Sequence, residues 1–189
     1  MKKILYLLIF TITSLIASSL DFNGPPQYSI KDGKVYYEVY PTYKEIEWVD
    51  VSTFEELLYG YAKDSKYIYY MGQAVEGADV KSFFVFDKGS VLDHNAYAID
   101  KYKVYFGGKA IEGVDLATFE VFDDKIARDE FSVYCSGNKL SNIDIKTFSY
   151  IGRLCSNDMW CKFSISVFKD KNGEYRTDDE DFDKKFVVK

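Results

Sequence analysis

Apolar and polar residues alternate along much of the chain in short runs, with a period of two residues that is typical of β-strands. In the run KYIYY (66–70), Ile68 and Tyr70 share one face of a predicted strand, and Tyr69 lies on the opposite face. Glycine and aspartate stand between the runs, where tight turns need them. Short strands bounded by such turns predict an all-β protein.

The alternating pattern is repeated in tandem. YMGQAVEGADVKSFFVFD begins at residue 70 and returns as FGGKAIEGVDLATFEVFD at residue 106, 36 residues later. A further copy follows 29 residues on, and an earlier copy with an insertion precedes both. The predicted organisation is a lead-in over 20–29, four repeats at 30–57, 61–86, 97–122 and 126–151, and a degenerate fifth repeat with a C-terminal cap over 152–189.

Each repeat has the same predicted anatomy. A strand such as YAKD ends in an Asx turn, a β-branched and aromatic strand follows, and a Gly-containing hairpin leads into a return strand. The motif Asp-x-x-Ser/Thr-Phe then predicts one helical turn capped by the aspartate, after which Phe83 or Phe119 enters the core. The segments FVFD and EVFD are expected to close the unit as a last strand.

A unit of this size cannot cover its own apolar face, so neighbouring units are expected to cover one another. The units are too short for ordinary four-stranded propeller blades, which favours an open array over a closed, propeller-like ring. The predicted core consists of one residue from each of three positions in each repeat: Val35, Ile68, Val104 and Val133; Ile46, Val75, Ile111 and Leu140; Phe54, Phe83, Phe119 and Phe148.

The segments KDSKYIYYMGQAVEGADVKSF and IDKYKVYFGGKAIEGVDLATF resemble the DKNYY family, bacterial repeat modules named for an Asp-Lys-Asn-Tyr-Tyr-like core. The resemblance covers about 30–151. It departs from the family pattern at Cys135, which replaces the second aromatic residue. The resemblance implies a repeat architecture and an exported bacterial protein. It implies no catalytic residue, because the family has no established activity.

The N-terminus predicts export. Lys2 and Lys3 precede an apolar run over 4–17, and small residues follow, which is the layout of a cleaved secretory signal over 1–19. An uncleaved membrane anchor is the alternative, although the run is short for a bilayer. Loss of the two lysines takes the formal charge from −6 to −8, which argues against nucleic acid and anionic membranes as partners. We therefore expect a periplasmic or secreted protein without stable membrane insertion.

Few residues suggest chemistry. Cys155 and Cys161 are close enough in sequence for a tentative disulfide, which would leave Cys135 as a thiol. His94, the sole histidine, lies in a predicted linker with no obvious nucleophile.

The repeated aspartates could serve as calcium ligands, but turns and caps already account for them. The aspartate-rich segment 170–181 resembles a calcium loop but has Tyr175 where the turn needs glycine. We expect no metal site, no cofactor and no enzymatic activity.

The strongest candidate for binding is a row of tyrosines at one equivalent position in each repeat: Tyr36, Tyr69, Tyr105 and Tyr134. If exposed, these rings would stack on sugars or grip a protein partner; if both strand faces are covered, they belong to the core. The sequence therefore predicts a non-catalytic binding scaffold for a protein or glycan at the cell envelope. The alternative is a purely structural spacer, and a hydrolase is the least favoured reading.

Overall fold

The computed structural model describes residues 27–39, 41–88, 95–155 and 164–178, which form five small antiparallel sheets. The first sheet contains β1 (Gln27–Lys31), β2 (Lys34–Val39) and β3 (Thr42–Glu45). The second contains β4 (Glu55–Glu56), β5 (Tyr61–Lys63), β6 (Ile68–Tyr70) and β7 (Gln73–Ala74). The third contains β8 (Phe84–Val85), β9 (Tyr97–Ile99), β10 (Val104–Phe106) and β11 (Lys109–Ile111). The fourth contains β12 (Glu120–Val121), β13 (Ile126–Arg128), β14 (Val133–Cys135) and β15 (Asn138–Lys139), and the fifth β16 (Ser149–Cys155), β17 (Ser164–Asp170) and β18 (Gly173–Arg176).

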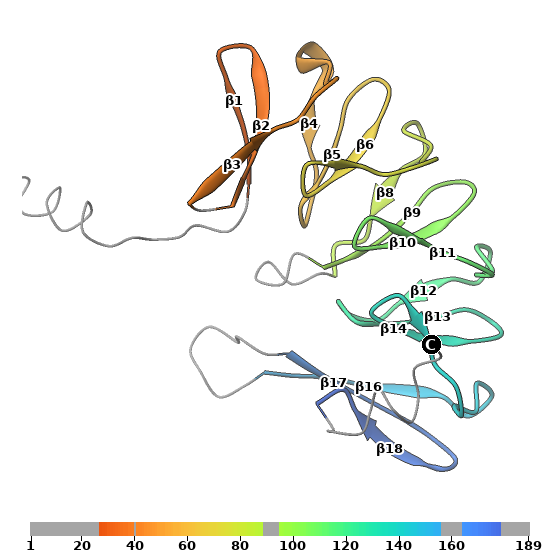
Figure 1. The fold of residues 1–189 in the computed structure, drawn as a ribbon. Coiled ribbons are helices and arrows are strands. Elements are labelled where there is room, and N and C mark those ends of the chain that lie inside the picture. The colour runs from red at the N-terminus through yellow and green to blue at the C-terminus, as the bar shows by residue number, and fades with distance from the viewer. Residues whose placement is uncertain (1–26, 40, 89–94, 156–163, 179–189) are drawn as a thin grey trace, which may run out of the picture.

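The sheets follow one another along an open arc (Figure 1). Neighbouring strands of each sheet are consecutive in the chain, so every sheet is a simple meander. The loop that joins β5 to β6 (64–67) and the loop that joins β9 to β10 (100–103) lie on the outer side of the arc, which we call the outer edge. The following hairpin turns, such as that at residues 107–108, lie on the opposite side, the inner edge. The all-β array of hairpin units is confirmed, and it is open.

The strand that ends each sequence repeat does not close its own sheet. Phe84 and Val85 of β8 pair with Ile99 and Ala98 of β9, in the following unit. The strand predicted to close each unit is therefore present, but it pairs with the following unit and not with its own. The preceding turn carries the chain across to the next sheet, so this strand opens that sheet and links two repeats covalently and through its hydrogen bonds.

The predicted helical turn is present in its shortest form. A 3₁₀ turn, η1 (Val51–Thr53), begins after Asp50, whose side chain accepts a hydrogen bond from the Ser52 N–H. In the next repeat the corresponding turn is closed by a hydrogen bond from the Ser82 N–H to the Asp79 carbonyl at 3.2 Å. The turn is too short to bury an apolar face and serves to redirect the chain.

Both faces of the second, third and fourth sheets are covered by neighbouring sheets. Ile68 and Tyr61 of the second sheet pack in one cluster with Ala98 and Tyr105 of the third. Tyr69, on the opposite face of β6, packs against the first sheet. Each copy therefore shields the next, and this removal of apolar surface from water is the main stabilising contribution to the array.

The predicted core residues occupy equivalent places in successive units. The second-strand residues Val35, Ile68, Val104 and Val133 are all at most 1% exposed. Phe83 packs between Tyr61 and Tyr105, with both ring centroids at 5.5 Å. The phenylalanines lie in matching slots: Phe54 between Tyr28 and Tyr69, Phe119 between Tyr97 and Tyr134, and Phe148 against Phe168. Of the remaining predicted core positions, Ile46, Val75 and Leu140 are buried, and Ile111 is partly buried.

Glycine at the inner edge sets how closely the sheets approach. Gly108 has φ +74°, and a β-carbon there would lie 2.7 Å from the Cβ of Tyr70 in the preceding sheet. Only glycine fits this approach without displacing the neighbouring backbone or ring. The same relation recurs between Gly72 and Tyr37 and between Gly137 and Phe106.

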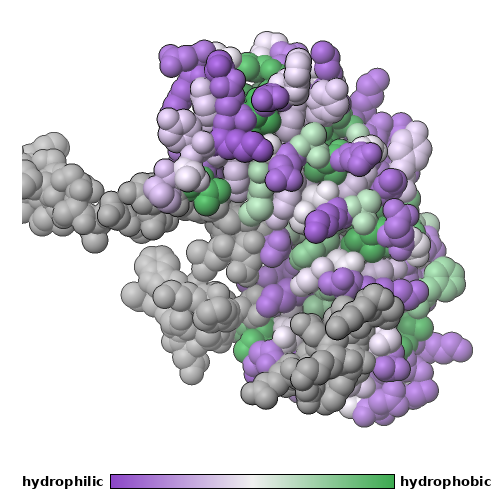
Figure 2. All heavy atoms as spheres, viewed as in Figure 1, coloured by the Kyte–Doolittle hydropathy of each residue, from purple (hydrophilic) through white to green (hydrophobic). Residues whose placement is uncertain are grey.

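The first sheet ends the described array with a face of ion pairs around the exposed ring of Tyr43. Ion pairs link Lys31 to Glu38 and Lys34 to Glu45 across its strands. Such a face needs no further repeat to cover it, as expected for the cap of a repeat array. On the side seen in Figure 2, hydrophilic residues cover most of the described surface, and apolar residues appear as small separate patches. Among the described residues, no helix has the length and apolar character that crossing a membrane requires.

Candidate functional site

The outer edge is organised by one buried aspartate in each of the second to fifth sheets. Asp100 is 3% exposed, and its carboxylate accepts four hydrogen bonds. Two come from the backbone of its own loop, from the Tyr102 and Lys103 N–H groups at 2.7 and 2.8 Å. The third comes from the hydroxyl of Tyr105 at 2.8 Å, and the fourth from the Asp79 N–H of the preceding turn, also at 2.8 Å. Asp100 therefore joins its loop, its second strand and the preceding repeat.

This arrangement, which we call the aspartate clamp, recurs along the array. The tyrosine hydroxyl five residues after the aspartate donates to it in each case: Tyr69 to Asp64, Tyr134 to Asp129 and Tyr175 to Asp170. The preceding turn also donates its backbone N–H in each case: Asp50 to Asp64, Asp115 to Asp129 and Asp144 to Asp170. The clamp thus extends into the fifth sheet, where the sequence repeat is degenerate.

A second link accompanies each clamp. The hydroxyl oxygen of Ser82 accepts a hydrogen bond from the Lys101 N–H at 3.1 Å, and the Lys101 ammonium lies 3.2 Å from the Asp79 carboxylate. Thr53, Thr118 and Thr147 accept the equivalent backbone hydrogen bonds in the other repeats. The Asp-x-x-Ser/Thr motif therefore caps its own turn and also receives the next loop.

The clamp explains why its aspartate is ionised and its tyrosine is neutral. Burial opposes ionisation of Asp100 and is the largest influence on its pKa, but the hydrogen bonds from Asp79, Tyr102, Tyr105 and Lys103 together hold that pKa below its usual value. The pKa values of Asp64 and Asp170 are lowered in the same way. Burial, followed by the hydrogen bond to Asp100, raises the pKa of Tyr105. The tyrosine thus stays a neutral donor to an ionised acceptor.

The clamp also decides the role of the predicted tyrosine row. Tyr69, Tyr105 and Tyr134 are at most 2% exposed, with both ring and hydroxyl used inside the array. They have no ring face open to a ligand, so at these three positions the second of the two alternatives holds and the rings belong to the core. Tyr36 differs because it lies in the first sheet, where it is half-buried and contacts the ring of Tyr43 at 5.7 Å.

A different row of rings is exposed at the outer edge. Tyr67, Tyr102 and Phe131 lie in the clamp loops of three successive sheets and are 47, 64 and 67% exposed. The Lys101 ammonium lies 4.7 Å from the centroid of the Tyr102 ring. Sequence reasoning missed this row, although an aromatic residue inside a polar four-residue turn was a usable signal. These rings are not needed for the core, because the clamp beneath them is already complete.

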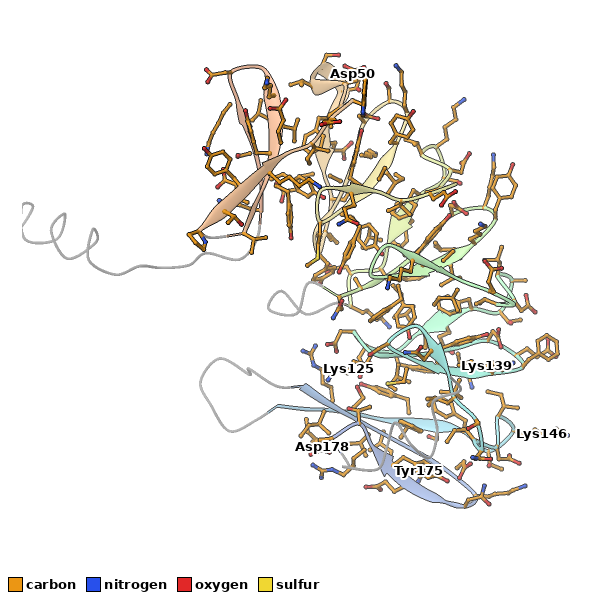
Figure 3. The ribbon with its side chains drawn as sticks, in the orientation of Figure 1. Asp50, Lys125, Lys139, Lys146, Tyr175 and Asp178 are labelled. Carbon is orange, nitrogen blue, oxygen red and sulfur yellow. The ribbon has the colours of Figure 1, made fainter. Side chains whose placement is uncertain are left out.

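Charged side chains of both signs accompany the exposed rings. Asp50 projects at the start of this edge and Lys146 near its end, whereas Lys125 and Asp178 lie on the opposite side (Figure 3). The Lys171 ammonium lies 2.7 Å from the Asp144 carboxylate, so part of this charge is already paired. The outer edge therefore offers aromatic rings in a mixed, locally neutralised polar setting rather than a field of one sign.

The model of the DKNYY family matches residues 28–179, most of the chain. The chain belongs to the DKNYY family. Comparison with curated proteins and with solved structures gives no match. The structure shows why the aspartate and a tyrosine recur in DKNYY repeats of this chain: they are the acceptor and donor of the clamp, so the motif maintains the architecture.

The remaining candidate residues contribute little. His94 and Cys161 lie outside the described residues, as does the side chain of Cys155, which ends β16. Within the described part of this DKNYY protein, no group of three or more His, Cys, Asp or Glu side chains is arranged to hold a metal ion. The clamp aspartates, which from the sequence could serve as calcium ligands, instead accept hydrogen bonds from backbone N–H and tyrosine O–H groups, as at Asp100.

Proposed function

We propose that this DKNYY protein is an exported, non-catalytic scaffold that binds a protein or glycan at the cell envelope through its outer edge. The observation that carries this proposal is the exposed ring row, Tyr67, Tyr102 and Phe131, with one ring in each of three successive clamp loops. Aromatic residues are enriched where proteins bind partners, because a ring buries a large apolar area with few rotatable bonds.

The rigidity of the clamp supports a binding role. Each ring is carried by a loop whose backbone is tied to a buried carboxylate, as in the Tyr102 N–H bond to Asp100. Stacked sheets lie about 10 Å apart, so successive clamp loops present their rings along one edge to an extended or flat partner. The row is not strictly regular, because Tyr67 is the fourth residue of its loop and Tyr102 and Phe131 are the third residues of theirs. A preorganised surface loses little conformational entropy on binding, which raises its affinity.

The test compares the mature chain with a variant in which Tyr67, Tyr102 and Phe131 are all replaced by Ser. Both proteins are presented to arrays of envelope glycans and envelope proteins. Saturable binding by the mature chain and its loss in the triple variant is the expected result. Tyr43→Ser is the matched control, because Tyr43 is 71% exposed but lies in the first sheet, outside the ring row.

Equal binding by the triple variant and the mature chain would place the partner elsewhere on the surface and end this assignment. Because all three rings are exposed, the substitutions should each change the free energy of unfolding by no more than about 0.5 kcal/mol. A large loss of stability would instead show that the rings belong to the fold.

A purely structural spacer is the second candidate, and burial of the predicted tyrosine row favours it. Tyr69, Tyr105 and Tyr134 serve packing and the clamp alone. The spacer reading gives the outer rings no partner. Absence of saturable binding across both arrays would favour the spacer over the scaffold.

A further inference from the structure

The inner edge carries a groove of about 470 Å³ between the hairpin turns of the third and fourth sheets, with Tyr70 of the second sheet in its wall. Its walls include the half-buried rings of Tyr70 and Phe106 and the side chains of Asn95, Lys109, Ser136 and Asn138. The volume is within the range of small-molecule sites, and the concave side of a repeat array is where such proteins commonly bind ligands. This groove is separate from the ring row, which lies on the outer edge.

Gly107 opens the groove. It occupies the hairpin position that Met71 fills in the preceding repeat and Ser136 in the following one. A β-carbon at Gly107 would lie 3.6 Å from both the Tyr70 hydroxyl and the Asn95 Oδ1. The space is therefore a feature of the third repeat, created by the absence of a side chain that its neighbours have.

The polar groups of the groove suit a ligand rich in hydroxyl groups. Amide and hydroxyl side chains offer both donors and acceptors, and sugar hydroxyls do the same. The Tyr70 hydroxyl donates to the Asn95 Oδ1 at 3.3 Å, a long bond at the floor of the groove. The rings of Tyr70 and Phe106 add apolar surface of the kind that stacks on a sugar ring.

Lys109 sets the charge preference. It is exposed on β11 and is the one charged side chain among the described residues that line the groove. In a chain of net charge −6, a lone lysine at a neutral polar site favours an anionic group on the ligand. A carboxylate beside the sugar ring meets this requirement.

We propose that the groove binds an acidic sugar, with the carboxylate at Lys109 and the hydroxyls at Asn95, Ser136 and Asn138. The test titrates the purified chain with cellobiouronic acid and with its neutral counterpart, cellobiose, and follows backbone amide chemical shifts. The expected result is saturable shifts centred on Asn138 and Gly107, with a Kd of about 1 mM for the acidic disaccharide and weaker binding of the neutral one.

Three variants sharpen the test. Lys109→Met should weaken binding of cellobiouronic acid roughly tenfold and leave cellobiose unaffected, because a charge-assisted hydrogen bond is lost. Gly107→Met should abolish binding of both sugars; Met71 has φ 48° in the same turn position, so the turn accepts this side chain. Lys139→Met is the matched control, because Lys139 is exposed on β15 but does not line the groove.

The proposal is overturned by unchanged affinity for the acid in Lys109→Met, or by shifts that are absent or fall outside the groove. Binding of an acidic peptide such as tetraglutamate in place of the sugar would also overturn it. Because the outer-edge triple variant keeps the groove intact, the loss of one site is measured independently of the other.

Discussion

Replacing Asp100 by Ala removes the acceptor of a complete clamp, and the structure allows its cost to be worked out. Water can satisfy the two loop N–H groups of Tyr102 and Lys103 once the loop relaxes. It cannot easily reach the Tyr105 hydroxyl, because that side chain is fully buried. Hydrogen bonds to a charged acceptor contribute about 1.5–3 kcal/mol each, so losing those from Tyr105 and the Asp79 N–H should cost about 3–6 kcal/mol.

The assay is equilibrium unfolding in urea at pH 7. With an m-value of roughly 2 kcal/mol/M, a loss of about 3 kcal/mol lowers the midpoint by about 1.5 M. Tyr105→Phe removes the hydroxyl alone and should cost about 1.5–3 kcal/mol. Since both changes break the same bond, the double variant should lose less than the sum of the single losses.

The effect of Asp100 also depends on pH with a defined sign. Its pKa in the fold is lowered, so its contribution is fully present above the unfolded value of about 3.9 and is lost as pH falls through the lower folded value. The difference between wild type and Asp100→Ala should therefore be largest above pH about 4 and shrink below it.

Glu112→Ala is the control for this experiment, because Glu112 is an exposed carboxylate in the same repeat. Equal urea midpoints for Asp100→Ala and Glu112→Ala would refute the reasoning. So would a difference in stability that persists unchanged in strong acid, because the clamp would then not depend on the ionised carboxylate.

Three further predictions concern the close approach at Gly108, the buried tyrosine hydroxyls and the N-terminal segment. Gly108→Ala should lower the free energy of unfolding in urea by about 2–3 kcal/mol, because it adds a clash with Tyr70 to a strained φ. Gly113→Ala is the control: its φ is +73° but the space around it is open, so it should cost about 1 kcal/mol. Equal costs for the two variants would contradict the close-approach argument. Burial raises the pKa values of Tyr61 and Tyr97, so these phenols should ionise only as the protein unfolds in alkali, which absorbance at alkaline pH measures; reversible ionisation in the folded protein would argue against their burial. Mass spectrometry of the protein exported from a bacterial host should show loss of the predicted signal peptide, and an intact N-terminus would favour a membrane anchor.

Much of the array was predictable because its signals are local. The alternation around Ile68 fixes a strand and its two faces, and its recurrence at Val104 and Val133 fixes the number of similar units. The packing positions of Phe83 and Phe119 were also predictable, since equivalent residues in stacked units meet equivalent neighbours. The partner of the linking strand at Phe84 was not predictable, because sequence order does not say on which side of a turn a strand will pair.

The exposure of the aromatic residues could not be predicted from the sequence. Tyr69 and Tyr67 are two residues apart in one hairpin, yet the first is 2% exposed and the second 47% exposed. Alternation assigns residues to faces but does not say which faces a neighbouring sheet will cover. The groove at Gly107 could not be predicted either, because it forms only where residues of three sheets lie side by side.

The amino-acid sequence by itself determined the repeat, its strands, its turns and the residues that had to be apolar, since each of these depends on neighbours within a few positions. Only the tertiary structure decided what the aspartates and tyrosines do. Asp100 meets the Asp79 N–H across 21 residues of chain, and that meeting exists only once two sheets have stacked. The same stacking buries one row of rings and leaves the other at the surface, because a sheet is covered on its faces while its edges remain open to solvent.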